Sequence, residues 1–163
     1  MKKPLLLIDV DGVLNPSMRP RSPMPEGYAS HDVGGQRVLL SQRHGEWLRE
    51  LADHFELAWV TTWEAEADAL IAPIIDAPAG LPFMSFPDLT DDGWTWKLPA
   101  VRRFVEDRAA AWLDDNPGPD AGEWAKSRVA PTLLVMPDPE VGWTRAECDE
   151  LIVFAKSCVE ARS

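Results

Sequence analysis

The feature that most constrains the fold is a short apolar run near the N-terminus that ends in two carboxylates. The run Leu5–Ile8 carries no polar side chain, and Asp9-Val10-Asp11-Gly12 follows it directly. A run that is apolar at every position predicts a strand covered on both faces, as in a parallel sheet between layers of helices. Ligands of open α/β sheets bind at the carboxyl ends of the strands. Asp9 and Asp11 are therefore candidate site residues, although an Asp pair is also common in an ordinary turn.

Strand-like and helix-like segments alternate along the rest of the chain, which predicts an α/β fold. We expect one domain over residues 1–163, with about five mainly parallel strands and helices on both faces of the sheet. The expected strands cover residues 5–8, 57–60, 83–86, 110–113 and 132–136. The expected helices cover residues 36–54, 64–75, 98–108, 123–129 and 145–159, and Thr144 and Glu147 form a capping box before the last. Residues 14–35, rich in Pro, Gly, Ser and Arg, predict a loop or flap.

Charge and composition limit the function classes. The formal net charge of −11 argues against a broad nucleic-acid-binding face. No apolar stretch approaches the roughly 20 residues that span a bilayer, and no secretory signal is evident, so we expect a cytoplasmic protein without membrane contact. Cys148 and Cys158 fall on one stripe of an expected helix, which predicts buried thiols and no bridge between them. Four arginines gather around the flap, where they can meet an anionic substrate or simply be surface residues: Arg19, Arg21, Arg37 and Arg43.

Asp9-Val10-Asp11-Gly12-Val13 resembles the first motif of the haloacid dehalogenase (HAD) superfamily, most of whose members are phosphatases. The resemblance implies a three-layer Rossmann-like fold in which the first strand lies between the second and the fourth. It also implies that Asp9 attacks phosphorus to form an aspartyl-phosphate and that Asp11 is the general acid and base. A carboxylate nucleophile splits one difficult step into two, and a positioned acid/base serves both. Gly12 allows a sharp turn there and is placed beside the substrate.

The family has three further motifs, and candidates for two of them follow in order. Thr61 ends an apolar run, with Thr62 as the alternative, and its hydroxyl would donate to a phosphoryl oxygen. Thr61-Thr62-Trp63-Glu64 is also a capping box, so a structural role competes. Lys97 begins an expected helix, where a cation is unfavourable to the helix dipole and indicates a nearby anion. The competing interpretation of Lys97 is a solvated surface lysine.

Asp114-Asp115 supplies the fourth motif, directly after the expected strand 110–113. The resemblance implies Mg²⁺ held by Asp9, by Asp114 and by the backbone carbonyl of Asp11, and magnesium prefers such hard oxygen ligands. Asp115 is left with two roles, as a ligand through water or as a stabiliser of the loop. A plain turn through Asn116-Pro117-Gly118 competes with the metal site.

The spacing of the motifs leaves little room for a cap domain. Only 49 residues separate Asp11 from Thr61, and 35 separate Thr61 from Lys97. We therefore expect a minimal cap, formed by the short flap. The resulting open site suits a large substrate, or else a protein partner or an oligomer completes it and excludes water.

A narrower resemblance rests on Thr61-Thr62-Trp63-Glu64, on Trp96-Lys97-Leu98-Pro99 and on Val141-Gly142-Trp143-Thr144. These segments are similar to the HAD domains of "Swiss Army knife" RNA-repair proteins, which implies removal of phosphate from an RNA or DNA end. Trp63 would then stack on a base, against the competing interpretation of packing. The leading hypothesis is a phosphomonoesterase acting on nucleic-acid ends or nucleotides. A small-metabolite phosphatase, a phosphotransferase and a non-catalytic module that binds magnesium or phosphate remain as alternatives.

Overall fold

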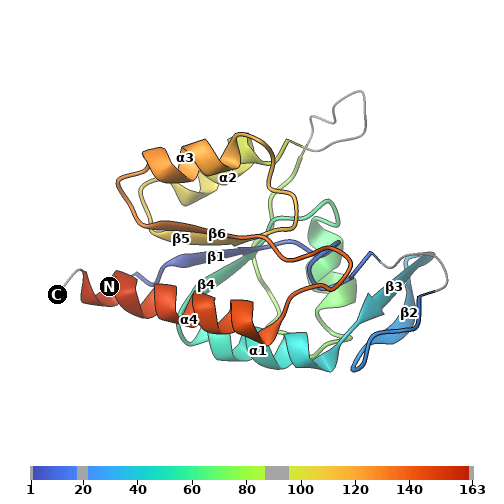
Figure 1. Cartoon of the computed structure of the whole chain (residues 1–163). Helices are drawn as coiled ribbons and strands as arrows, with labels where there is room; N and C mark the ends of the chain where they lie inside the picture. Colours follow the sequence, from blue (N-terminus) through green and yellow to red (C-terminus); the bar gives the residue numbers. More distant parts are fainter. Residues whose placement is uncertain (1, 18–21, 87–95, 162–163) are drawn as a thin grey trace.

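The computed structural model describes residues 2–17, 22–86 and 96–161 (Figure 1). Its centre is a four-stranded parallel sheet in the order β4-β1-β5-β6. The strands are β1 (Leu5–Ile8), β4 (Glu56–Trp59), β5 (Ala110–Leu113) and β6 (Thr132–Val135). The expected α/β class and the central place of the first strand are confirmed.

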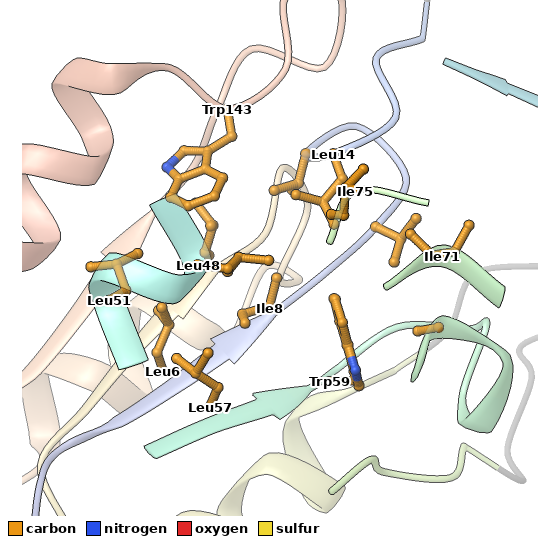
Figure 2. Close-up of a cluster of buried hydrophobic side chains, with 14 of the residues drawn as sticks. Leu6, Ile8, Leu14, Leu48, Leu51, Leu57, Trp59, Ile71, Ile75 and Trp143 are labelled. Carbon is orange, nitrogen blue, oxygen red and sulfur yellow. The ribbon is translucent and has the colours of Figure 1, made fainter. Parts of the chain in front are cut away.

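Helices cover both faces of this sheet, which makes three layers (Figure 1). On one face lie α1 (Gln42–Ala52) and α4 (Arg145–Glu160), and on the other lie α2 (Leu98–Val105) and α3 (Ala121–Ser127). Alternate residues of β1 point to opposite faces. Leu6 and Ile8 join the cluster under α1 and α4, which Figure 2 shows, whereas Leu5 and Leu7 join the cluster under α2 and α3. Both faces are buried, as the uniformly apolar run predicts.

The expected helix from residue 36 is wrong over its first five residues. Residues Gln36–Leu40 form β3, which pairs antiparallel with β2 (Ala29–Val33) inside the segment expected to be a loop. Gly34 and Gly35 both have positive φ, of 59° and 80°. A two-residue turn of this kind suits the twist of a hairpin. The helix α1 begins only at Gln42, and residues 29–35 of the expected flap belong to this β-hairpin.

Two further elements differ from expectation. Residues 83–86 make a single bridge from Phe83 to Trp59, so the expected strand there is wrong. The expected helix 64–75 contains η1 (Ala67–Ile71), a π-helical turn, and it begins after Glu64 at a φ of 48°. The carboxylate of Glu64 accepts the backbone N–H of Phe86 at 3.0 Å. Glu64 therefore connects the turn after β4 to the segment around Phe86. The sequence had predicted a different role for Glu64, in a capping box with Thr61.

The last helix matches its prediction closely. Thr144 and Glu147 form the expected capping box at the start of α4. Cys148 and Cys158 are both buried on this helix, also as expected. Within the described residues, no helix is both long and apolar enough to cross a membrane.

A buried aromatic cluster connects the hairpin side of the molecule to α1. The imidazole of His44 stacks on Trp143 with ring centroids 5.3 Å apart, and the ring of Tyr28 meets it edge-on. His44 Nε2 donates to the backbone carbonyl of Trp143 at 2.9 Å, because a carbonyl can only accept. Nδ1 is buried and has no partner among the described residues. Burial, helped by the charge of Arg43, lowers the pKa of His44 to about 4.

The depressed pKa of His44 predicts a pH-dependent stability. An unfolded chain takes up this proton as the pH falls through 6.5, whereas the folded chain takes it up only at about 4. The contribution of His44 is therefore present above pH 6.5 and is lost as the pH falls toward 4. Between about pH 7.5 and about pH 5 this group removes about 2 kcal/mol from the free energy of unfolding.

Urea unfolding of His44→Gln at the two pH values checks this. Glutamine keeps an N–H donor for the carbonyl of Trp143 but does not titrate, so the variant loses less stability on acidification than the wild type. His31→Gln, in β2, is the matched control and falls in parallel with the wild type. An equal loss in His44→Gln and the wild type would contradict the prediction.

Candidate active site

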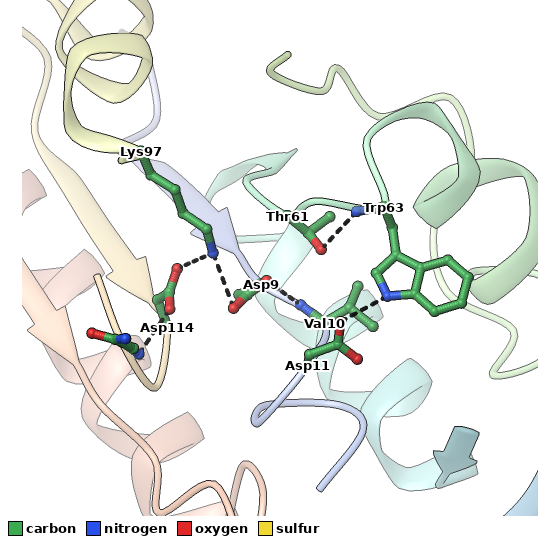
Figure 3. A network of polar contacts seen from close by, with 8 residues as sticks. Asp9, Val10, Asp11, Thr61, Trp63, Lys97 and Asp114 are labelled. Carbon is green, nitrogen blue, oxygen red and sulfur yellow. Dashed lines mark hydrogen bonds and ion pairs between the residues drawn. The ribbon is translucent and has the colours of Figure 1, made fainter. Parts of the chain in front are cut away.

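Three strands deliver polar side chains to one edge of the sheet. Ile8 of β1 is in register with Trp59 of β4 and with Leu113 of β5, so these strands end side by side. Asp9 and Asp114 follow β1 and β5 directly, and Thr61 lies two residues beyond β4. All three side chains are buried. The structure thus brings together the three predicted residues that follow strands (Figure 3).

Lys97 reaches this edge from the start of α2. Its ammonium nitrogen lies 3.0 Å from Asp9 Oδ2 and 2.6 Å from Asp114 Oδ2, between the two carboxylates (Figure 3). Burial opposes the charged form, but the two carboxylates outweigh it and raise the pKa of Lys97. Only 6% of the residue is exposed, which rules out the solvated surface lysine. A lysine at a helix start was expected to have an anion nearby, and the structure shows that the carboxylates of Asp9 and Asp114 take this place.

The surroundings of Asp9 disfavour the ionised form of its carboxyl group. Burial first, and then the neighbouring Asp114, raise the pKa of Asp9 well above its usual value, although Lys97 acts in the opposite direction. Asp9 Oδ1 accepts the backbone N–H of Val10 at 2.8 Å, which fixes the carboxylate plane. A nucleophilic carboxylate has to be ionised. Further positive charge beside Asp9 would favour that form.

In the part of the chain that the structure describes, Asp9, Asp114 and Asp115 could supply a metal site. One carboxylate oxygen of each lies within 4.8 Å of the others. Three carboxylates therefore face the single ammonium group of Lys97, and this excess of hard oxygen donors fits a divalent cation such as Mg²⁺. Asp115 also packs on Gly12, where an added Cβ would approach its Cγ to 2.3 Å. Gly12, at a φ of 77°, is needed both for the turn and for this close approach.

Asp11 lies beside this cluster with its carboxylate held by two other donors. Asn15 Nδ2 donates to Asp11 Oδ1 at 2.8 Å, and the indole N–H of Trp63 donates to Oδ2 at 3.0 Å. Asn15 in turn accepts the backbone N–H of Leu39 on β3 at 2.9 Å. The hairpin is thereby connected to Asp11 through one side chain. The sequence analysis missed Asn15, whose only signal is its place in the turn four residues after Asp11.

The other predicted substrate-binding residues lie around this edge. The side chain of Trp63 is 8% exposed and orients Asp11, so stacking on a base stays a prediction. Thr61 Oγ1 accepts the backbone N–H of Trp63 at 3.3 Å, which orders the turn after β4. Thr62 is exposed next to it. The contacts of Thr61, Thr62 and Gly12 with a substrate stay predictions, as does a metal bond to the backbone carbonyl of Asp11.

Comparison with known proteins identifies the family. A family model described as "HAD domain in Swiss Army Knife RNA repair proteins" matches residues 5–148, from β1 into α4. A search of curated proteins found no match. The matched range contains every residue of the edge described above. The chain therefore belongs to the family of HAD domains found in Swiss Army Knife RNA repair proteins.

Proposed function

We propose that this chain is a magnesium-dependent phosphomonoesterase whose nucleophile is Asp9. The observation that carries the proposal is the buried contact of Lys97 with both Asp9 and Asp114 at the carboxyl edge of the sheet. Burying an ion pair is expensive, and such pairs with perturbed pKa values gather at functional sites. Membership in this HAD family supports an active site at the same edge.

The residues at this edge divide the reaction into two displacements. Asp9 attacks phosphorus in line and forms the aspartyl-phosphate, while the bond from phosphorus to the leaving oxygen breaks and Asp11 donates a proton to that oxygen. Asp11 then takes a proton from water, and this water attacks phosphorus to release phosphate and restore Asp9. Lys97 and the hydroxyl of Thr61 offset the negative charge on the phosphoryl oxygens. A bound Mg²⁺, held by Asp9, Asp114, Asp115 and the carbonyl of Asp11, would supply further charge neutralisation.

We infer that the substrate is a phosphorylated nucleic-acid end or a nucleotide. The family description associates these domains with RNA repair. Residues 29–35 of the flap belong to a short hairpin, which agrees with an open site that a large substrate or a protein partner completes. The net charge of −11 favours contact with a terminal phosphate over contact with a long stretch of polynucleotide. The buried thiol of Cys148, which forms no disulfide, agrees with a reducing compartment such as the cytoplasm.

Substitution of the two catalytic carboxylates tests the mechanism. Asp9→Asn removes the nucleophile and abolishes hydrolysis, whereas Asp11→Asn retains the nucleophile and lowers kcat by about 10²- to 10⁴-fold. The assay measures phosphate release, with Mg²⁺, from 3′- and 5′-phosphorylated oligonucleotides, mononucleotides and sugar phosphates. Asp107→Asn, beyond the far end of α2, is the matched control and keeps full activity.

Each outcome of this assay separates the alternatives. Unchanged activity in Asp9→Asn would exclude the proposed mechanism. Turnover of sugar phosphates alone would point to a small-metabolite phosphatase. Transfer of phosphate to an added alcohol in preference to water would identify a phosphotransferase. Binding of magnesium and inorganic phosphate without any turnover would identify a non-catalytic module.

The acidic cluster predicts stabilisation by magnesium. A metal that binds only the folded state at about 100 times its Kd adds about 2.7 kcal/mol, which corresponds to a rise in Tm of roughly 5 to 10 °C for a chain of this size. We expect this rise in the wild type and its reversal by chelator. The rise is lost in Asp114→Asn, reduced in Asp115→Asn and kept in Asp107→Asn. A rise of the same size in all four proteins would show that the cluster does not hold the metal.

A further inference from the structure

A hollow lies next to Asp11, between the loop after β1 and the hairpin. Its volume is about 460 Å³, which is in the range of small-molecule sites. The described residues that line it are Asn15, Pro16, Ser17, Ser22, Met24, Arg37 and Leu39. One of them, Asn15, is the residue that donates to the carboxylate of Asp11. The hollow therefore adjoins the acid/base side of the site.

The reaction sequence determines what would lie in this hollow. In the first step, Asp11 must reach the oxygen of the leaving group, whereas Asp9 attacks phosphorus from the opposite side. The part of the substrate beyond that oxygen thus extends on the Asp11 side. Asn15 Nδ2 lies 2.8 Å from Asp11, so the wall of the hollow begins within one hydrogen bond of the proton donor. The hollow is placed to receive the leaving group.

The lining of the hollow shows what kind of leaving group fits. Arg37 and Leu39 lie two residues apart on β3, so they share the face opposite to the buried side chains of Val38 and Leu40. Arg37 Nε donates to Ser30 Oγ at 2.8 Å, which holds the guanidinium along the hairpin. Among the described residues of the lining it is the one charged side chain, beside apolar groups such as Met24, which is 46% exposed. A guanidinium recognises phosphate through paired N–H donors.

We propose that this hollow is a leaving-group subsite for a nucleoside that carries a second phosphate, and that Arg37 binds this second phosphate. The inference rests on the proposed function, because it assigns the acid/base role to Asp11. The chain has a net charge of −11, so Arg37 supplies a local attraction for anions that the net charge of the chain does not provide. In the proposed mechanism the reacting phosphate is already bound by Lys97 and Thr61, so this attraction serves a second phosphate. Both an oligonucleotide end and a free nucleoside bisphosphate have this chemistry. Arg37 thereby becomes a specificity residue that sequence alone could not separate from the other flap arginines.

A binding experiment tests the subsite apart from turnover. Adenosine 3′,5′-bisphosphate is titrated into Asp9→Asn protein with Mg²⁺, beside adenosine 3′-monophosphate and adenosine 5′-monophosphate. Whichever phosphate of the bisphosphate enters the site, the other is available to Arg37. We expect the bisphosphate to bind about tenfold more tightly than either monophosphate, the range of one charge-assisted contact. Adding Arg37→Gln removes this preference, and Arg37→Lys keeps part of it.

The controls separate a failure of this inference from a failure of the proposed function. Arg102→Gln, on α2, removes the same charge from a different groove and keeps the preference. A preference that survives Arg37→Gln, an equal loss in Arg102→Gln, or no preference in the Asp9→Asn protein would overturn the subsite. With active protein, KM values for a 3′-phosphorylated dinucleotide and the matching mononucleotide give the second readout. A binding preference without any turnover would overturn the proposed function, and only the contact of Arg37 with a second phosphate would then stand, without its leaving-group role.

Discussion

The structure of the site depends on one buried contact, the ammonium group of Lys97 between the carboxylates of Asp9 and Asp114. Taking three charged groups out of water costs several kcal/mol per ion before their attraction is counted. Removal of Lys97 would leave two buried carboxylates facing each other, a change that typically costs about 3 to 5 kcal/mol. An apolar core would be cheaper for stability alone. A role of this contact in phosphoryl transfer therefore explains it better than a contribution to the stability of the fold.

The surrounding fold positions the three residues of this contact, Lys97, Asp9 and Asp114. The strand β1 is paired in register on both sides, with β4 and with β5, so the ends of the three strands meet. Each strand is covered on both faces, which makes its end a rigid position. The helix α2 brings Lys97 in from one side, and the loop after β1 brings in Asp11 from another. The hairpin is connected to the same place by the hydrogen bond from Leu39 to Asn15.

Much of this arrangement could be predicted because it follows from local patterns. The apolar runs 5–8 and 110–113 coincide with β1 and β5, since a strand buried on both faces has an unmistakable composition. Lys97 and Asp114 were predicted because their places, at a helix start and a strand end, match the later motifs of the family that the N-terminal motif resembles. The hairpin was missed, although Gly34-Gly35 between two five-residue segments is a turn signal, because the polar residues around it favoured a loop. The contacts of Asn15 and Trp63 with Asp11, and the approach of Asp115 to Gly12, depend on tertiary packing that no single segment encodes.

The proposed mechanism depends on a covalent bond between the carboxylate of Asp9 and phosphorus. The most direct measurement is rapid acid quenching of the Asp11→Asn protein during turnover of a phosphorylated substrate, followed by proteolysis and mass spectrometry of the peptides. With an aryl phosphate, whose leaving group departs without a proton from Asp11, this variant forms the intermediate and hydrolyses it slowly, so we expect a phosphoryl group on the peptide that contains residues 5–15, located at Asp9. A phosphoryl group on any other residue, or substrate turnover by this variant with no covalent adduct at any time, would contradict it.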